Sequence, residues 1–250
     1  MIKKKINTSI ILVGGTGSRF SNIKEHPKQL AKINKEIIII RIIKQLKKFG
    51  INHFIFPLGH KKEFFIKFFN SKKNIKKFNF NVIKSFDKIK KNKININYFD
   101  AGKKTSKLDR ILKSFKKIKS NDFLITYGDG LANINIKKLF SSYFKDKGEK
   151  IYLTSYRKRS QYGHLKVNNK NEVTEFIEKP PHPLPINIGY YMINKQIIEK
   201  YYKKHFELEI DFLPLLEKKN LLISSEHKGY FYSINDKKEF LTAKKNLKNL

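Results

Sequence analysis

A glycine-rich turn near the N-terminus is the first segment whose residues could bind a phosphate group. Gly14-Gly15-Thr16-Gly17-Ser18-Arg19-Phe20 follows directly on a short apolar run. Glycines let a backbone approach a phosphate closely and aim its N–H groups at it. Arg19 adds a planar, permanently charged group that suits phosphate oxygens. The turn lacks the ending of a P-loop and the spacing of a dinucleotide-binding loop. A tight strand-to-helix turn would explain the glycines equally well.

Lys28 and Asp129 could complete a phosphate site. Lys28 lies in Pro27-Lys28-Gln29-Leu30, within loop reach of the glycine turn, where its ammonium group could neutralise a triphosphate. In a lysine-rich chain its position has meaning only through these neighbours. Asp129 ends a strand-like run, and open α/β sheets place ligands at such strand ends. Taken alone, its Asp-Gly pair is more typical of a simple turn.

The spacing of apolar residues indicates the elements that would hold these groups. Strand-like runs alternate with helical patterns in the first part of the chain, with strands at 8–13, 51–58, 94–98 and 123–127 and helices at 39–46, 61–70 and 108–118. This alternation predicts βαβ units and a mostly parallel sheet. Later strands follow one another closely, at 151–156, 165–167, 173–177, 186–193, 221–225 and 230–234. We expect one domain over residues 1–250, with a nucleotide-type half to about residue 150, a β-rich substrate half over 151–250, and one continuous sheet.

The composition limits the classes of protein to which the chain can belong. Cysteine is absent, which excludes disulfides, thiolate metal sites and a cysteine nucleophile. The net charge of +34 suggests a polyanionic partner, but all except five of the 55 basic residues are lysines, spread along the whole chain. A specific nucleic-acid site would more often concentrate arginine and aromatic residues on one face. We therefore expect no specific nucleic-acid partner, and only weak, salt-sensitive attraction to polyanions.

No apolar run reaches the length of a membrane-spanning helix. The basic start Met1–Lys5 is followed by an apolar run that is too short for a secretory signal. We expect a cytoplasmic, soluble protein with no membrane partner.

Taken in order, the motifs resemble those of the sugar-1-phosphate nucleotidyltransferases. The glycine turn and the Pro27–Leu30 segment are followed at the family's rough spacing by further matching segments, namely Gly59–Phe64, Thr126–Gly130, Tyr162-Gly163, Glu178-Lys179-Pro180 and Ile186–Tyr190. The resemblance spans about residues 8–247. Within the family it is strongest to the bacterial glucose-1-phosphate cytidylyltransferases, through Thr126–Gly130 and Thr105–Arg110. It implies a Rossmann-like, GT-A-like α/β fold with a mostly parallel mixed sheet flanked by helices.

The resemblance also implies roles for individual residues. The implied catalytic residues are Arg19, Lys28 and Asp129. The implied nucleotide-binding residues are Leu12, Gly14, Gly15, Gly17 and Ser18, with Thr105 and Lys107 near the base. The implied sugar-binding residues are Tyr127, Gly163, Glu178, Lys179 and Asn187, of which Lys179 would hold the sugar phosphate. The implied cofactor is Mg²⁺, held by Asp129 and a second acid. We expect the glycine turn, Lys28, Asp129 and Lys179 to converge on one cleft.

The second metal ligand is where the chain departs from the family pattern. The expected aspartate aligns with Asn235, and Asp236 stands beside it. Asparagine is a poorer Mg²⁺ ligand because it carries no charge. Asp236 could take the role through a shifted turn, or it could be only the N-cap of the final helix.

The implied reaction joins a nucleoside triphosphate and a sugar 1-phosphate into an NDP-sugar and pyrophosphate, with CTP and glucose 1-phosphate as the favoured pair. Positioning and charge neutralisation suffice for this chemistry, so no covalent nucleophile is needed. Asn235 leaves open an alternative, a weakly active or inactive regulatory module that binds a nucleotide or NDP-sugar. A homo-oligomer is compatible with the resemblance.

Overall fold

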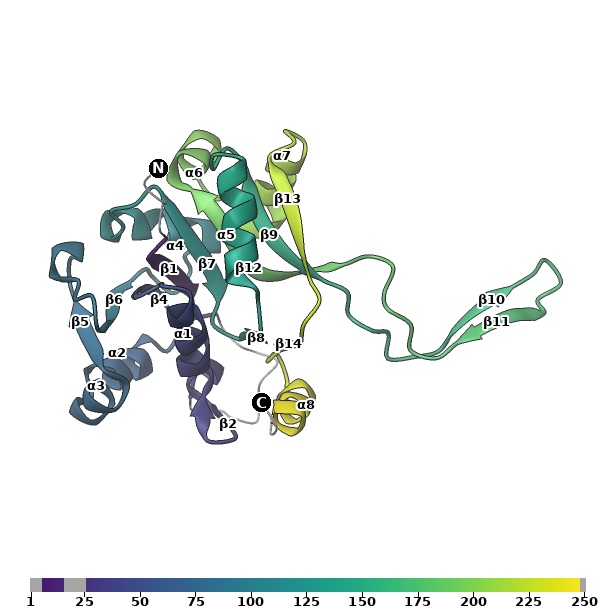
Figure 1. Ribbon diagram of the computed structural model, residues 1–250, viewed down its shortest axis with the longest axis horizontal. Coiled ribbons are helices and arrows are strands. Elements are labelled where there is room, and N and C mark those ends of the chain that lie inside the picture. Colours follow the sequence, from purple (N-terminus) through teal and green to yellow (C-terminus); the bar gives the residue numbers. More distant parts are fainter. Residues whose placement is uncertain (1–5, 16–25, 248–250) are drawn as a thin grey trace.

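An eight-stranded sheet forms the centre of the computed structural model, which describes residues 6–15 and 26–247 (Figure 1). Its strands lie in the order β13 (Leu222–His227), β9 (Ile151–Tyr156), β12 (Ile186–Asn194), β7 (Asp122–Tyr127), β1 (Thr8–Leu12), β4 (His53–Leu58), β6 (Ile94–Asp100) and β5 (Phe80–Ile83). Strand β12 runs antiparallel to both of its neighbours, whereas the other pairs in the sheet are parallel. The predicted α/β class and mostly parallel sheet are confirmed.

The central strands are apolar throughout because both faces of the sheet are covered. In β1 and the residue after it, Ile10 and Leu12 pack into one core layer, and Ile11 and Val13 pack into the other. Helices α1 (Ile38–Lys48), α2 (Lys62–Asn70) and α5 (Ile136–Lys145) contribute to the layer that contains Ile11, and α3 (Lys72–Phe78) follows α2. Helices α4 (Lys107–Ser114), α6 (Lys195–Tyr201) and α7 (Leu213–Glu217) contribute to the layer that contains Ile10. Continuous apolar runs are typical of such doubly covered parallel strands.

Two helices agree with the sequence pattern in most of their detail. Helix α1 buries its isoleucines at helical spacing, and Gly50 follows it in the left-handed region at φ 91°. In α2, Phe65 and Phe69 are fully buried. Phe64 and Phe68, which we also expected to face inward, are only partly buried, because they lie at the flanks of the stripe that faces the sheet.

A small second sheet brings the C-terminal part of the chain to the end of the central strand β7. Strand β8 (Gly130–Ala132) pairs antiparallel with β14 (Phe231–Ser233), and helix α8 (Lys237–Asn246) follows. The hairpin of β2 (Lys32–Ile33) and β3 (Glu36–Ile37) precedes α1. The β8–β14 pairing therefore places the start of α8 beside the end of β7.

The expectation of one continuous sheet is wrong for three of the later strands. Strand β14 pairs with β8 outside the large sheet. Strands β10 (His164–Val167) and β11 (Val173–Ile177) pair only with each other among the described strands. They form a ribbon that stands off from the body of the molecule (Figure 1). The return segment contains Pro180, Pro181, Pro183 and Pro185, which cannot donate to a central ladder. We call residues 157–185 the arm.

A buried histidine fixes the start of β4. The His53 side chain is 1% exposed, and its Nδ1 lies 3.2 Å from the Thr8 hydroxyl across the β1–β4 ladder. Its Nε2 has no hydrogen-bond partner among the described residues. Burial lowers the pKa of His53 to about 4, so the folded protein keeps this ring neutral at neutral pH.

We expect His53 to make stability fall in mild acid. The unfolded chain binds a proton at this residue below about pH 6.5, whereas the folded chain binds it only near pH 4. The free energy of unfolding should therefore drop by about 2 kcal/mol between pH 7 and pH 5 through this group alone. Denaturant unfolding at both pH values should show a drop smaller by this amount in His53→Gln. The control His205→Gln, at an exposed side chain, should match the wild type, and an equal drop in all three proteins would contradict the assignment.

Candidate active site

One cleft of about 750 Å³ lies at the carboxyl ends of the parallel strands. Strand β1 pairs with β4 on one side and with β7 on the other, so the connections leave β1 in opposite directions. Ligands of open α/β sheets bind at such a switch point. The segment from Leu12 to Gly15 forms one wall, and Tyr127, Asp129 and Gly130 form another. The volume falls in the range of pockets that hold small molecules.

The start of the glycine turn is held by close contact with the loop after β4. Gly14 has φ 90°, and a Cβ there would lie 2.8 Å from the Gly59 nitrogen. The Gly14 carbonyl accepts a hydrogen bond from the His60 N–H at 3.3 Å. At Gly15, a Cβ would meet no atom within 4 Å in the part of the chain that the structure describes. Gly14 is therefore required by packing, whereas Gly15 faces open space in the cleft.

A buried arginine joins three loops of the cleft. The Arg110 guanidinium donates at 2.8 to 3.4 Å to five backbone carbonyls, those of Val13, Pro57, Gly102, Lys103 and Thr105. These carbonyls follow or end β1, β4 and β6. Burial lowers the pKa of Arg110, while the nearby carboxylates of Asp100 and Glu207 act in the opposite direction. Because the carbonyl dipoles satisfy this cation, Arg110 fixes the loops relative to one another.

Lys28 gathers two oxygen donors from distant parts of the chain. It follows Pro27 in a short 3-10 turn, η1 (Lys28–Leu30). Its Nζ lies 2.7 Å from Oδ2 of Asp129 and donates to Oδ1 of Asn235 at 3.2 Å. The N–H of Ile234 donates to the Asp129 carbonyl at 3.0 Å, which extends the β8–β14 pairing to the cleft. The result is a cation and two oxygen donors clustered on the cleft wall.

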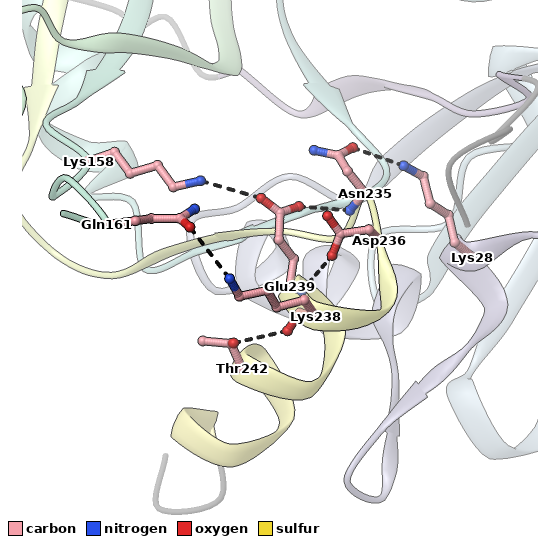
Figure 2. A network of polar contacts seen from close by, with 8 residues as sticks. All are labelled: Lys28, Lys158, Gln161, Asn235, Asp236, Lys238, Glu239 and Thr242. Carbon is pink, nitrogen blue, oxygen red and sulfur yellow. Dashed lines mark hydrogen bonds and ion pairs between the residues drawn. The ribbon is translucent and has the colours of Figure 1, made fainter. Parts of the chain in front are cut away.

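The residue after Asn235 has a different role. Figure 2 shows that Asp236 faces the start of α8, where its Oδ1 accepts the Glu239 N–H at 2.8 Å. Glu239 in turn accepts the Asn235 N–H at 3.1 Å. The first bond caps the N-terminus of α8, and the second holds the residue that precedes the cap. Asp236 is thus the N-cap of α8, and among the described residues the cleft lining includes Asn235 and Glu239 but not Asp236.

A polar network lies on the other side of the cleft. The Tyr127 hydroxyl lies 2.8 Å from the Tyr191 hydroxyl and donates to Glu209. Asn187 donates to the Tyr191 hydroxyl at 2.5 Å, and Lys107 donates to Glu209 at 2.6 Å. Glu209 comes from η4 (Leu208–Phe212), a π-helical turn. Four elements far apart in sequence, α4, β7, β12 and η4, therefore meet at this network.

The two tyrosines of this network stay protonated at neutral pH. Burial, reinforced by Tyr191 and Glu209, raises the pKa of Tyr127 far above its ordinary value. Burial also raises the pKa of Tyr191 to about 12. Both hydroxyls therefore remain donors, and Asn187 is held in place by its bond to one of them.

The structure brings many of the expected site residues together. The cleft is lined by Leu12, Gly14, Gly15, Lys28, Thr105, Lys107, Tyr127, Asp129 and Asn187. Gly17, Ser18 and Arg19 lie outside the described residues. Of the four groups expected to converge, the described part of the glycine turn, Lys28 and Asp129 do so.

Lys179 does not join them, which corrects the expected convergence. Gly163, Glu178 and Lys179 lie on the arm, which contributes Lys158 to the cleft lining but none of these three residues. A Cβ at Gly163 would lie 2.7 Å from the Phe176 ring, so here the glycine serves packing within the arm. Lys179 Nζ lies 2.9 Å from Glu178, and both side chains are 58% exposed. The cause is the same proline-rich return that separates the ribbon from the large sheet.

Sequence reasoning missed three groups that shape the cleft, namely Arg110, Tyr191 and Glu209. Arg110 could have been suspected, because an arginine inside an apolar helical pattern is unusual in a chain whose basic residues are nearly all lysines. Tyr191 and Glu209 carry no such local signal, because their role depends on contacts between distant elements.

Comparison with known proteins identifies the class. Residues 8–247 match the nucleotidyl transferase family, and the chain belongs to it. The chain is 32% identical over 248 residues to a probable glucose-1-phosphate cytidylyltransferase of Bacillus subtilis (strain 168), which covers 95% of this chain and 94% of that protein. It is 28% identical over 251 residues to a D-glycero-alpha-D-manno-heptose 1-phosphate guanylyltransferase of Aneurinibacillus thermoaerophilus, which covers 96% and 98%. These matches confirm the sugar-1-phosphate nucleotidyltransferase family that the motifs indicate.

Solved structures agree on the fold. HddC from Yersinia pseudotuberculosis superposes with a TM-score of 0.68 at 22% identity, over 97% of this chain and 100% of that one. A UDP-glucose pyrophosphorylase complexed with UDP-glucose gives a TM-score of 0.69 at 19% identity, over 96% and 98%. The GT-A-like fold is therefore confirmed. Over residues 6–15 and 26–247, no helix has both the length and the apolar character that crossing a bilayer requires.

We expect Arg110→Lys to weaken nucleotide binding more than turnover. A lysine cannot satisfy all five carbonyls, so the loop that carries Thr105 should lose its fixed position. Loss of about 1.4 kcal/mol of pre-organisation would raise the KM for the nucleoside triphosphate about tenfold, with a smaller change in kcat. Steady-state kinetics on folded protein would measure this. Arg41→Lys, at a helix surface where Arg41 pairs with Glu36, should change KM less than twofold. Equal KM values in the two variants would refute this role.

Proposed function

We propose that the chain transfers a cytidylyl group from CTP to glucose 1-phosphate, giving CDP-glucose and pyrophosphate. The observation that carries the proposal is the meeting of Gly15, Lys28, Asp129 and Asn187 in one cleft at the switch point of the sheet. The polar network around Tyr127 supports a hydroxyl-rich substrate on one side. The side of the cleft formed by the glycine turn and Lys28 carries positive charge, which suits a triphosphate.

The reaction needs charge neutralisation more than covalent chemistry. A phosphate oxygen of the sugar 1-phosphate attacks the α-phosphorus of the triphosphate. The bond from this phosphorus to the oxygen bridging to the β-phosphate breaks, and pyrophosphate leaves with the bonding electrons. Lys28 offsets the negative charge that grows on the α-phosphate and the leaving group. Backbone N–H groups at Gly14 and Gly15 would orient the phosphates.

The residues beside Lys28 fit a magnesium ion. Oxygen atoms of Asp129 and Asn235 converge on one cation, the Lys28 ammonium. Among the described residues no group of three His, Cys, Asp or Glu side chains could hold a metal. Mg²⁺ is commonly held by one or two carboxylates together with substrate phosphates and water, so Asp129 would hold the ion with Asn235 as a neutral oxygen donor. When bound, Mg²⁺ neutralises phosphate charge.

The choice of cytosine as the base and of glucose as the sugar rests on the names of the relatives. The Bacillus subtilis relative is named a glucose-1-phosphate cytidylyltransferase, whereas the Aneurinibacillus relative is named a guanylyltransferase. Thr105 and Lys107 line the cleft beside the glycine turn, as the cytidylyltransferase resemblance implies for residues near the base. The test must therefore span bases and sugars.

The test offers each of the four nucleoside triphosphates with each member of a sugar 1-phosphate panel in the presence of Mg²⁺. Pyrophosphate release should require both substrates and be fastest with CTP and glucose 1-phosphate, and mass spectrometry should identify CDP-glucose. Lys28→Ala should lower kcat by about 10²- to 10³-fold, as the loss of one charge-stabilising donor does. Lys35→Ala, an exposed lysine in the next turn, is the matched control. Binding without turnover for every pair would favour the regulatory module instead.

Two neighbouring substitutions test the metal site. Asn235→Asp should lower the Mg²⁺ concentration for half-maximal rate several-fold, because a carboxylate binds this ion better than an amide. Asp236→Ala should leave that concentration unchanged and reduce the free energy of unfolding by about 1 kcal/mol through loss of the helix cap. Magnesium titrations of pyrophosphate release and denaturant unfolding would measure both. The reverse pattern would assign the metal to Asp236.

A further inference from the structure

A bulge in β12 brings two polar side chains of one strand into contact. Asn187 and Tyr191 are four residues apart, and in a regular strand their Cα atoms would lie about 13 Å apart. The register between β12 and β9 shifts between these two residues, and Gly189 has φ 78° at this point. A Cβ at Gly189 would collide with the Tyr127 ring, so glycine also admits that ring. Bulges of this kind re-aim side chains beside active sites.

Glu209 is held at the far end of the same polar network by its own local structure. It lies in the π-helical turn η4, whose Leu208 and Phe212 side chains are buried. At the start of this turn the Glu207 N–H donates to the Asp211 carboxylate at 2.8 Å. Turns of the π type are rare and occur frequently at functional sites. The Glu209 side chain therefore reaches the network from a fixed backbone.

The hydrogen bonds of the network run in one direction. Glu209 forms an ion pair with Lys107 at 2.6 Å, and an ionised carboxylate only accepts. The Tyr127 hydroxyl donates its single proton to Glu209, so its oxygen accepts from the Tyr191 hydroxyl, 2.8 Å away. The Tyr191 proton is then used as well, and its oxygen accepts from the Asn187 amide at 2.5 Å. Every proton in this chain of bonds thus points toward Glu209.

This direction fixes which way round the Asn187 amide stands. Its Nδ2 faces Tyr191, and its Oδ1 accepts the Gly189 N–H at 3.0 Å. An amide nitrogen carries two N–H donors, of which Tyr191 takes one. The other has no acceptor among the described residues, and Asn187 lines the cleft. Asn187 therefore presents an N–H that suits an accepting ligand atom, such as the oxygen of a sugar hydroxyl.

Glu209 reaches both sides of the cleft without lining it. Of the five residues in the network, Lys107, Tyr127 and Asn187 line the cleft, whereas Tyr191 and Glu209 do not. Lys107 is held by the Glu209 carboxylate and also lies 5.2 Å from the centre of the Tyr127 ring. Asn187 is held by the same carboxylate through two hydroxyl groups. One carboxylate thus places a cleft residue on each side.

We propose that Glu209 is a positioning residue that sets the specificity of the sugar side of the cleft. Through Tyr127 and Tyr191 it turns the Asn187 amide so that an N–H, and not the carbonyl oxygen, meets a hydroxyl oxygen of the sugar 1-phosphate. This inference rests on the proposed function for the identity of that ligand. Glu209 also places Lys107, which the proposed function assigns to the nucleotide, so one carboxylate serves both substrates.

Two conservative variants separate this role from a general loss of structure. Tyr191→Phe removes the acceptor of the Asn187 amide. It should raise KM about tenfold for the sugar 1-phosphate that the wild type uses fastest, and change KM for the nucleoside triphosphate less than twofold. Glu209→Gln removes the charge that orders the chain of bonds, and it should raise both KM values because Lys107 also loses its partner.

The matched control is Glu217→Gln, at an exposed carboxylate of α7. It should give the wild-type values of both KM parameters. A Tyr191→Phe variant in which both KM values rise equally, or in which neither changes, would overturn the proposal.

Deoxy analogues of the sugar 1-phosphate test the hydrogen bond itself. The wild type should lose at least about tenfold in kcat/KM with the analogue that lacks the hydroxyl facing Asn187. Asn187→Ala identifies this analogue, because the penalty should fall below about threefold for it. The penalty for the same analogue should fall equally in Tyr191→Phe and Glu209→Gln. A Glu209→Gln variant that keeps the full penalty would contradict the positioning role, as would a wild type that accepts every analogue equally.

A double variant tests whether Glu209 acts through Asn187. In an Asn187→Ala background, Glu209→Gln should change KM for the sugar 1-phosphate less than twofold, because the group that it positions is already absent. A tenfold effect that persists in this background would show that Glu209 acts by another route, and the proposal would fail.

Unfolding in urea gives a readout that needs no substrate. Within the described structure no hydrogen bond joins Glu209 to Tyr191 directly, so the Tyr127 hydroxyl is their link. The unfolding equilibrium constant of the double variant Glu209→Gln, Tyr191→Phe should differ from the product of the two single effects by at least about threefold. Additive effects would rule out the chain of bonds. Coupling in a protein that is inactive with every substrate pair would refute the proposed function and leave the chain in place.

Discussion

The cleft depends on a buried cation that has carbonyl dipoles for partners. Arg110 makes no ion pair among the described residues, and its five carbonyl acceptors come from β4 and from the loops that follow β1 and β6. The carboxylates of Asp100 and Glu207 favour its charged form, but the five carbonyls are its hydrogen-bond partners. One side chain thus joins the segments that shape this part of the cleft.

The second wall depends on pairing between distant segments. Strands β8 and β14 bring Asn235 to Asp129, and Lys28 joins the two. The same pairing sets the start of α8, whose cap is Asp236. A one-residue shift of this ladder would exchange Asn235 and Asp236 between cleft and cap, because alternate residues face opposite sides. The register of two three-residue strands therefore decides which of these side chains can approach a cation.

The sequence predicts the glycine-turn side of the site better than the network around Tyr127, for a physical reason. The apolar runs of β1 and β7 can be recognised locally in the sequence, and Gly14, Gly15 and Asp129 follow them. Parallel strands bring their carboxyl ends to one edge of the sheet, and Lys28 lies within loop reach of that edge. Tyr191 and Glu209 act through hydrogen bonds to residues that lie 64 to 102 positions away in the sequence, which no local pattern encodes. The strands at 164–167 and 173–177 can also be recognised locally, but the direction in which this ribbon leaves the body depends on prolines and on contacts with α8. A strand's existence is a local property, whereas the sheet it joins is not.

The arm and the charge cluster are linked through one carboxylate. Glu239 accepts from Asn235 on one side and pairs with Lys158 at the base of the arm on the other. A single exposed ion pair adds little stability, yet the backbone hydrogen bonds across the arm base and the two contacts of Arg157, with Glu226 and the Pro183 carbonyl, act with it. Lys158 and Glu239 both line the cleft, so this set anchors the base of the arm at the cleft wall. The base of the arm and the Lys28 cluster therefore share one wall of the cleft, and Glu239 connects them.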